Sequence, residues 1–542
     1  MDPHQSPLEQ RERAFDRLTH SHWDVLVVGG GISGAGIAWQ LSRWGVSVAL
    51  VEQNDYASGT SSRSSKMIHG GFRYLPHGEL GLVRQVSRER TRLARLMPHL
   101  ISPLPMTIPA YRGGPFPLWA LALGSGIYDR LGRIDATMAH RRLDPRSVKQ
   151  RAPGIREDNL QGGIAYFEFG GLDARINWAV IATAAQQGVL ALNYVRALFD
   201  QSTLKANGPS SVAVEDRLRG RMGTVEAQVV VNAAGPWADQ LDRESHLVRS
   251  RGIHLVFPRK KFPLDFATIL PTPENANIFA VPRGPVTYLG TTDNPDTSSI
   301  ENPDLVAEDA QYLLGVANRL FPRLNLKLAD VIAAWSGVRP LIAQDREART
   351  DRLSRRDLVV ARPSLVTVLG GKFTGFRATA ENVAQTVLER LGGASKAARP
   401  ESIADAPRGE QITALQTVLD QAGVSWAVAR YGTRSLEWLA WARDRGHDAL
   451  EPVLANVPLV QADIDWEILF EDARSVADVL IRRTGLAWLG GLRPEAVREM
   501  ARRTAERMRI WLQWSADETE RQIRDFWHTG YFDDVVKWNQ TH

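Results

Sequence analysis

Two short, continuous runs of apolar residues lie near the N-terminus, at residues 25–28 and 48–51. Runs of this length are typical of strands that are buried on both faces of a parallel sheet. The segment between them has helical character, so the order is strand, helix, strand. The pattern therefore predicts a βαβ unit between about residues 23 and 52, and an α/β fold.

The same alternation returns later in the chain. It predicts strands at 191–197, at 226–232 and from residue 365, the last followed by a helix over 375–391. Residues 251–345 instead read mostly as strands, at 253–257, 278–281, 286–290 and 331–338. We interpret this block as a β-rich substrate domain inserted into the α/β fold.

The remaining segments have other patterns. Residues 79–97 place apolar positions at helical spacing among many arginines, which predicts an amphipathic helix. Residues 1–21 read as a polar arm and residues 397–407 as a linker. Residues 408–542 are predominantly helical in pattern and rich in Trp and Arg, which predicts a separate C-terminal helical domain.

Composition narrows the function. At 542 residues the chain is too long for one core, so two or three domains are expected. The net charge of +5 suits an anionic substrate or an anionic membrane surface, and the scattered Lys and Arg argue against nucleic acid. The absence of cysteine excludes disulfides, thiolate metal sites and cysteine nucleophiles. No metal-ligand spacing is present, so no metal site is predicted.

The first 22 residues lack the apolar core of a secretory signal. The uncharged run at residues 113–128, which is punctuated by proline and glycine, is shorter than the ~20 residues of a spanning helix. This run is either a core segment or an interfacial segment that dips Trp119 and Leu121 into lipid headgroups. The second interpretation draws on the flanking arginines Arg112, Arg130 and Arg133.

A glycine-rich turn follows the first strand, with Gly29, Gly31 and Gly34 in a Gly-x-Gly-x-x-Gly pattern. Gly29 allows the tight turn, Gly31 the close approach of a pyrophosphate, and Gly34 the packing of helix on sheet. The helix N-terminus supplies N–H groups for phosphates. Glu52, at the end of the second strand, can accept hydrogen bonds from ribose hydroxyls. Together these features predict a dinucleotide site.

Several polar side chains near glycines are candidates for substrate chemistry. Arg339 and Arg73 have guanidinium groups that suit phosphate or carboxylate, although a surface ion pair is the common role of an arginine. His254 and His69 can act as a general base, although a buried structural histidine is the more frequent role for either. Lys372 precedes the helix at 375–391. If the ring system of a flavin lies there, the positive charge of Lys372 and the helix dipole would both favour negative charge on the edge of that ring.

Five stretches taken together resemble the FAD-dependent glycerol-3-phosphate dehydrogenases. They are residues 29–36, 60–75, 232–237, 290–293 and 336–341, of which 60–75 is the most specific. The similarity runs from about residue 10 to 395, with a fainter echo at 431–433 and 478–484. At the last strand–helix junction Gly375 and Phe376 replace the Thr and Tyr usual in the family.

The resemblance implies an α/β fold in which an FAD-binding Rossmann-like domain of the D-amino-acid-oxidase type carries a β-rich substrate domain and a C-terminal helical domain. The oxidoreductase unit would span residues 22–396. Its FAD-binding parts would lie at about 22–78, 155–248 and 335–396, and its substrate-domain parts at about 79–154 and 249–334.

The resemblance also implies oxidation of sn-glycerol 3-phosphate to dihydroxyacetone phosphate, with hydride transfer to FAD and electrons passed to a quinone. Arg73, Tyr74 and Arg339 would bind the phosphate or polarise the reacting oxygen, and His254 would accept the proton. Lys372 would face the flavin. The expected cofactor-binding residues are Gly29, Gly31, Gly34, Glu52, Thr60, Ser61, Ser65, His69, Gly70, Gly235, Gly371 and Thr374.

Two alternatives stay open. The same fold could serve an oxygen-using amine or 2-hydroxy-acid oxidase, with Arg339 binding a carboxylate. The fold could also be a non-catalytic assembly module that uses its Trp-rich helical part. For the leading hypothesis we expect a cytoplasmic protein bound peripherally to the cytoplasmic face of the inner membrane, and a homodimer is left open.

Overall fold

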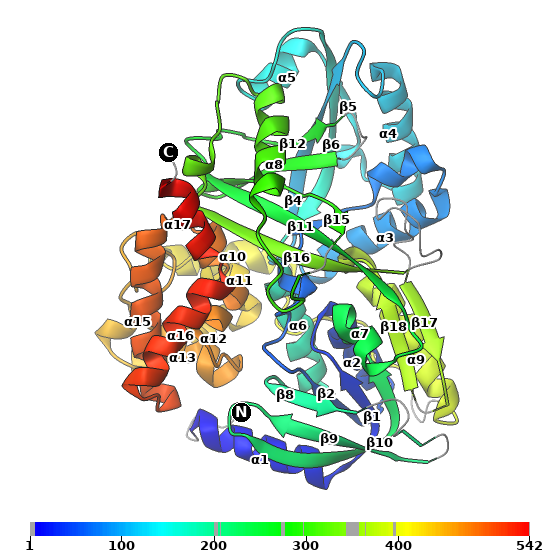
Figure 1. The fold of residues 1–542 in the computed structure, drawn as a ribbon, viewed down its shortest axis with the longest axis vertical. Coiled ribbons are helices and arrows are strands. Elements are labelled where there is room, and N and C mark those ends of the chain that lie inside the picture. The colour runs from blue at the N-terminus through cyan, green and yellow to red at the C-terminus, as the bar shows by residue number, and fades with distance from the viewer. Residues whose placement is uncertain are drawn as a thin grey trace.

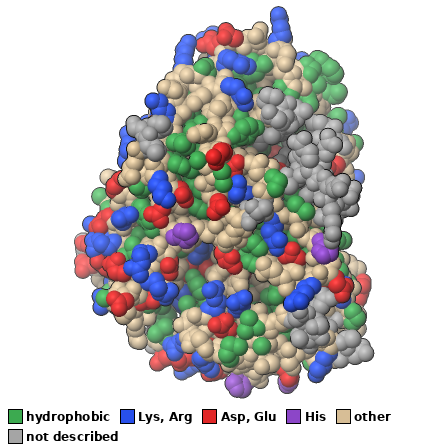
Figure 2. Space-filling model, viewed as in Figure 1, with side chains coloured by type: hydrophobic (Ala, Val, Ile, Leu, Met, Phe, Trp, Pro, Cys, Tyr) green, Lys and Arg blue, Asp and Glu red, His purple; other side chains and the backbone are tan. Residues whose placement is uncertain are grey.

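The computed structural model describes residues 6–199, 204–205, 208–272, 277–295, 298–342, 357–363, 365–393 and 397–540. These residues form two β-sheets and a block of C-terminal helices that lies along one side of both sheets (Figure 1). Over the face shown in Figure 2, Lys and Arg side chains are interspersed with Asp and Glu. This distribution agrees with the nearly balanced composition.

The first sheet has the strand order β17-β18-β10-β1-β2-β7, in which β18, β10, β1, β2 and β7 run parallel. The predicted βαβ unit is present as β1 (His22–Val28), α2 (Ile32–Arg43) and β2 (Val48–Val51). The other strands are β7 (Leu190–Leu192), β8 (Val195–Leu198), β9 (Ser210–Asp216), β10 (Arg221–Asn232), β17 (Asp357–Ala361) and β18 (Leu365–Gly370). This parallel core confirms the predicted α/β fold.

Both faces of this sheet are covered, which explains the continuous apolar runs. Val25 and Val27 of β1 pack on one face into a core shared with α2, α6 (Asp173–Gln186) and α9 (Phe376–Arg390). Leu26 and Val28 pack on the other face. A strand buried on both sides shows no alternation of apolar and polar residues.

The polar N-terminal arm is helical and packs on the first sheet. Ser6 and Glu9 form a capping box at the start of α1 (Pro7–His20). Phe15 and Leu18 are buried in the core on the outer face of the first sheet, and Arg11 donates to Asp216 of β9 at 2.9 Å. The sequence did not predict this packing, because the helix is mostly polar and only one narrow stripe of it is apolar.

The second sheet has ten strands and is mostly antiparallel. Its main order is β15-β11-β14-β13-β12-β4-β6-β3, with β16 paired to β11 and β5 paired to β6. The strands are β3 (Met67–Ile68), β4 (Ser102–Tyr111), β5 (Arg141–Leu143), β6 (Leu160–Gly170), β11 (Leu247–Pro258), β12 (Ala267–Pro271), β13 (Asn277–Arg283), β14 (Val286–Gly290), β15 (Asn294–Pro295) and β16 (Ala333–Ile342).

Two features of this sheet differ from the predicted organisation. Strands β6 and β16 hydrogen-bond within it, although their residues fall inside the segments expected to bind FAD. The predicted boundary at residues 334/335 falls inside β16, whereas β6 lies wholly within the predicted segment 155–248 and still pairs with β4 of the second sheet. The predicted strand block also contains a helix, α8 (Ala307–Leu320), which buries Ala310, Leu313 and Ala317 at helical spacing.

The amphipathic helix expected at 79–97 is present as α3 (Leu80–Leu96). It packs beside α4 (Leu118–Gly132), which occupies most of the uncharged run. Leu121 is buried there, which corrects the expectation that it would reach a membrane together with Trp119. The exposed apolar residues of α4 are instead Trp119, Leu123 and Ile127, which recur at every fourth position. No helix of the described ranges is long and apolar enough to span a bilayer.

The predicted C-terminal helical domain is present, and part of its core is continuous with that of the second sheet. Apolar residues of both parts belong to one buried cluster, Val256 and Trp335 from the sheet with Leu480 and Trp488 from the helices. The helices are α10 (Gly409–Gln421), α11 (Ala427–Tyr431), α12 (Ser435–Asp444), α13 (Gln461–Phe470), the π-helix η11 (Asp478–Arg483), α14 (Leu486–Leu489), α15 (Pro494–Leu512), α16 (Ala516–Thr529) and α17 (Phe532–Gln540). Short helices elsewhere are α5 (Pro145–Arg151) and α7 (Ala238–Leu241).

Candidate active site

A cavity of about 2110 Å³ lies between the two sheets. Its floor is the carboxyl edge of the first sheet, where Val28, Val51 and Ala233 end or follow their strands, and its roof includes His254 and Arg339 of the second sheet. Sites for single small ligands occupy about 300–1,000 Å³. The cavity therefore has room for a dinucleotide and a small substrate, at the edge where open α/β sheets bind ligands.

The glycine turn at the end of β1 lines this cavity. Gly29 has a φ of +113°, and a Cβ there would lie 2.5 Å from the carbonyl oxygen of Ala233. A Cβ at Gly34 would overlap the carbonyl oxygen of Gly29, so this position is where the helix packs on the turn. Gly31 caps α2 without a side-chain hydrogen bond and faces the cavity. The chain can therefore bring backbone close to a bound group here.

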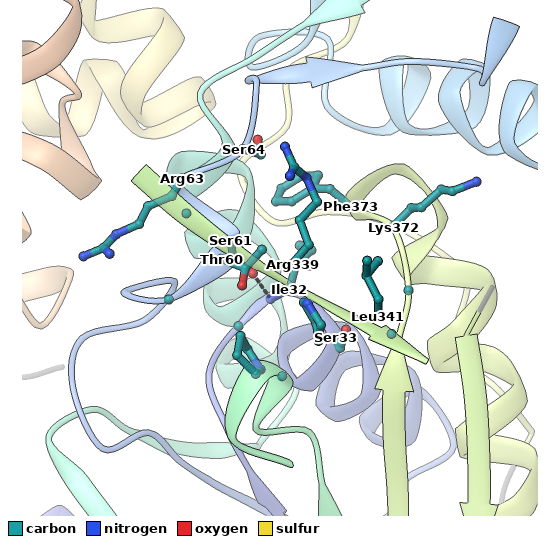
Figure 3. Close-up of a pocket in the computed structure, with 18 of the residues that line it drawn as sticks. Ile32, Ser33, Thr60, Ser61, Arg63, Ser64, Arg339, Leu341, Lys372 and Phe373 are labelled. Carbon is teal, nitrogen blue, oxygen red and sulfur yellow. Dashed lines mark hydrogen bonds between the residues drawn. The ribbon is translucent and has the colours of Figure 1, made fainter. Parts of the chain in front are cut away.

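The start of α2 is built to receive an anion. Ser61 Oγ accepts a hydrogen bond from the N–H of Ile32 at 2.9 Å, and Ser33 lies beside it on the wall (Figure 3). Asn177 Nδ2 donates to the carbonyl oxygen of Gly30 at 3.1 Å and holds the turn from below. The free N–H groups and dipole of a helix start stabilise phosphate oxygens.

Glu52 marks one end of the cavity. Its carboxylate accepts hydrogen bonds from the N–H groups of Gly30 at 2.7 Å and Asn54 at 2.9 Å. Burial raises the pKa of Glu52, and these two hydrogen bonds oppose the shift. Val195 and Ala197 provide apolar wall nearby. A carboxylate beside an apolar wall, next to a phosphate-binding turn, fits the ribose and adenine of FAD.

His254 lies on β11 in the cavity wall. The ring is stacked on Trp335, with centroids 4.7 Å apart and planes 14° apart, and its Nε2 lies 2.9 Å from Ser65 Oγ. Burial holds the pKa of His254 well below its usual value, and the positive charges of Arg339 and Lys66 lower it further. The imidazole is therefore neutral at ordinary pH, and a neutral imidazole offers one acceptor nitrogen.

The guanidinium of Arg339 lies near this histidine. Arg339 extends from β16 across the cavity in the direction of Ser64, and its Nη2 donates to Thr291 Oγ1 at 2.8 Å (Figure 3). Its Nη1 lies 3.4 Å from Asp293 Oδ1. This contact is long and therefore weak, so a phosphate could take the place of the carboxylate. Lys372 Nζ lies 3.8 Å from the ring centroid of Tyr74. This end of the cavity is suited to a small anion.

Residues 24–384 match the family model described as FAD dependent oxidoreductase, and residues 370–519 match the C-terminal domain of alpha-glycerophosphate oxidase. The aerobic glycerol-3-phosphate dehydrogenase of Bacillus subtilis is 33% identical over 507 residues, which cover 89% of this chain and 90% of that protein. Its counterpart in Staphylococcus aureus is 35% identical over 393 residues, 70% of each chain. The chain belongs to the FAD-dependent glycerol-3-phosphate dehydrogenase family.

A solved structure supports this assignment. The glycerol-3-phosphate dehydrogenase from Bacillus halodurans, which was solved with FAD, superposes with a TM-score of 0.79 at 27% identity and covers 99% of this chain and 98% of that one. Glycine oxidase from Geobacillus kaustophilus, at 21% identity and a TM-score of 0.51, shows the shared fold alone. The chain is thus an FAD-dependent member of the family over nearly its whole length.

The structure of this family member brings most of the predicted residues to one cavity. Its lining includes the expected binding residues Gly29, Gly31, Glu52, Thr60, Ser61, Ser65, His69, Gly235, Gly371 and Thr374, together with Tyr74, His254, Arg339 and Lys372. Gly70 is different, because it packs behind the wall, where a Cβ would overlap the hydroxyl of Tyr128. The side chain of Arg73 lies outside the described residues.

Other residues at the site were not identified from the sequence. Lys66 is fully buried, and its Nζ donates to Asp173 Oδ1 at 2.8 Å and to the carbonyl oxygen of Ser62 at 2.7 Å. Trp335 supports the ring of His254. Lys66 lies within the quoted motif, but its partner is 107 residues away, so no local pattern signals the pair. Among the described residues, no group of His, Cys, Asp or Glu is placed to hold a metal ion.

Proposed function

We propose that this protein oxidises sn-glycerol 3-phosphate to dihydroxyacetone phosphate and passes the electrons to a quinone. The observation that carries the proposal is the pairing of a neutral, buried His254 with Arg339 in a cavity that also contains the glycine turn. A base beside a phosphate-binding guanidinium is what a phosphorylated alcohol requires.

Bound FAD would supply the hydride acceptor, and Gly29, Gly31 and Glu52 would hold it in the cavity. His254 accepts the proton of the substrate hydroxyl, because its depressed pKa leaves the imidazole unprotonated. Ser65 fixes the ring through the contact to Nε2. Arg339 exchanges its weak contact with Asp293 for the substrate phosphate. Lys372 and the start of α9 add positive potential where negative charge develops.

The test is anaerobic bleaching of the flavin. Purified, flavin-loaded protein mixed with glycerol 3-phosphate should lose its yellow absorbance in a single turnover. His254→Gln should slow this step by about 10²–10⁴-fold, since it removes the general base. Arg339→Met should raise the substrate concentration needed for half-maximal rate. Bleaching by an amino acid, and none by the phosphate ester, would overturn the proposal in favour of an amine oxidase.

The electron acceptor and its location form the second part of the proposal. Quinones are dissolved in the bilayer, so the enzyme must reach a membrane surface. The exposed stripe of Trp119, Leu123 and Ile127 on α4 supports such contact, and the exposed Arg130 and Arg133 at its end suit anionic headgroups. We therefore propose a peripheral association with the cytoplasmic face of the inner membrane.

A further inference from the structure

The ring of His254 is held from two sides by neighbouring strands. Gly290 of β14 and Trp335 of β16 are its direct cross-strand partners. A Cβ at Gly290 would overlap the imidazole, so the glycine backbone closes one side. Trp335 stacks on the ring at 4.7 Å, and Trp335 Nε1 donates to the carbonyl oxygen of Ser64 at 3.2 Å. The position of the imidazole therefore follows that of Trp335.

Trp335 is in turn supported from the C-terminal helices. Trp488 of α14 stacks on it, with centroids 5.5 Å apart and planes 25° apart. Trp488 is 2% exposed, and its Nε1 lies 3.4 Å from the carbonyl oxygen of Gly530, between α16 and α17. A continuous series of stacked rings thus connects the C-terminal helices to His254.

Lys66 joins the same assembly. Its Nζ lies 5.0 Å from the ring centroid of Trp335 and 5.3 Å from that of Trp488, so the ammonium is close to both indoles. Aromatic faces stabilise a buried cation, which here is also paired with Asp173. The neighbouring residue, Ser65, is the one that contacts His254. Trp488 therefore contacts both Trp335 and Lys66, the two side chains that determine the surroundings of His254.

We propose that Trp488 is a positioning residue for the reaction, which acts through Trp335 and Lys66 to keep His254 oriented and dry. This inference rests on the proposed role of His254 as proton acceptor. It gives the C-terminal helices a part in the chemistry, although none of the described residues of α10 to α17 lines the cavity.

The charges around His254 set the direction of the expected effect. Arg339 and Lys66 are the cations that act on it, Asp173 balances Lys66, and Tyr288 lies edge-on at 6.2 Å. Burial is the largest cause of the lowered pKa of His254. A smaller side chain at position 488 admits water beside Trp335 and Lys66. This water makes His254 less buried and screens the repulsion between Lys66 and a protonated His254. The pKa of His254 then rises toward 6.5, and protonation removes the base at higher pH.

The experiment compares full-length, flavin-loaded Trp488→Leu and Trp488→Phe with a control, Trp438→Leu. Trp438 is equally buried in the C-terminal helices and stacks on Tyr431, at 5.4 Å and 26°. The bleaching rate is measured against pH. In parallel, His254 is titrated by NMR in protein with labelled histidine and without substrate, using His254→Gln to assign its signal.

In Trp488→Leu we expect the acid limb of the pH profile and the His254 titration to move up by about one pH unit. The rate at neutral pH should fall about tenfold, because the ring is less well oriented. Trp488→Phe, which keeps one ring, should fold and show a smaller shift in the same direction. Trp438→Leu should lower the melting temperature and leave the pH profile unchanged.

Unshifted profiles in both Trp488 variants, or an equal shift in Trp438→Leu, would overturn the inference. The two proposals fail separately. If the unmodified enzyme is not bleached by glycerol 3-phosphate, the proposed function is wrong, whereas the substrate-free titration of His254 still decides whether Trp488 controls this histidine.

Discussion

At the scale of single residues, the positive φ of Gly29 allows a test of cofactor binding by substitution. Its φ of +113° strains any other residue, and a Cβ would meet the carbonyl oxygen of Ala233. Gly29→Ala should therefore shift the turn out of the cavity and yield protein with much less FAD. Gly81→Ala is the matched control, because a Cβ at that helical position meets nothing within 4 Å. The flavin-to-protein absorbance ratio after gel filtration measures both, and equal ratios would contradict the role of Gly29.

At this scale the sequence predicted the roles of the motif residues, but it did not predict their long-range contacts. The Gly-x-Gly-x-x-Gly spacing carries its own geometry, so Gly29, Gly31 and Gly34 could be assigned roles without a structure. The contact between Ser65 and His254 joins residues 189 positions apart. Gly70 was expected in the site because it lies within the motif, yet steric contact with Tyr128 explains that glycine. A sequence motif shows which segment lies at the site, but only the packing shows which of its residues face the cavity.

At the scale of elements, the segment after β2 is clamped by the π-helix η11. Asp55 accepts hydrogen bonds from Arg483 at 2.7 and 2.9 Å and from Arg482 at 2.6 Å. Burial raises the pKa of Asp55, but Arg483 and Arg482 outweigh it and lower the pKa to about 2. This ion pair connects the cofactor-binding segment to the C-terminal helices, and its partners are 428 positions apart. The sequence predicted that residues 408–542 are mostly helical, but it could not reveal this interface.

Breaking the clamp should destabilise the whole protein. Arg483→Met leaves the carboxylate of Asp55 buried with one cation fewer, which should cost about 3–5 kcal/mol of unfolding free energy. Asp55→Asn should flatten the loss of stability between about pH 4 and pH 2, since the stabilising charge of Asp55 is present above its unfolded pKa and lost as pH falls. Urea unfolding measures both. Glu499→Gln, in an exposed ion pair on α15, should change little, and an equal effect there would contradict the argument.

At the scale of the whole molecule, the fold class and the order of the parts could be predicted, but their packing could not. Apolar runs identified the first sheet because strands buried on both faces leave a strong local signal. The second sheet takes strands from widely separated regions of the chain, including β3, β6 and β16, and its register depends on contacts distant in sequence. For the same reason the sequence predicted the C-terminal helical domain but not the core that it shares with the second sheet, in which Trp335 and Trp488 lie together.

The exposed face of α4 gives the prediction that belongs to this scale. Trp119 and Leu123 are 65% and 61% exposed, whereas Leu121 between them is buried. Wild-type protein should float with liposomes that contain anionic lipid, and high salt should weaken this binding because the arginines near α4 are screened. Trp119→Glu combined with Leu123→Glu should abolish flotation, since two carboxylates would have to enter the headgroup region.

The control for that experiment is Ile510→Glu. Ile510 is 68% exposed on α15, which lies on the opposite side of the molecule from α4 (Figure 1). This change adds one exposed carboxylate, half the charge of the double variant, and leaves the stripe on α4 intact, so flotation should persist. Quinone reduction should follow flotation, because a membrane-dissolved acceptor is reached only by bound enzyme, while anaerobic bleaching should be equal in all three proteins. Flotation of the double variant at the wild-type level would show that the membrane contact, if any, lies elsewhere than on α4.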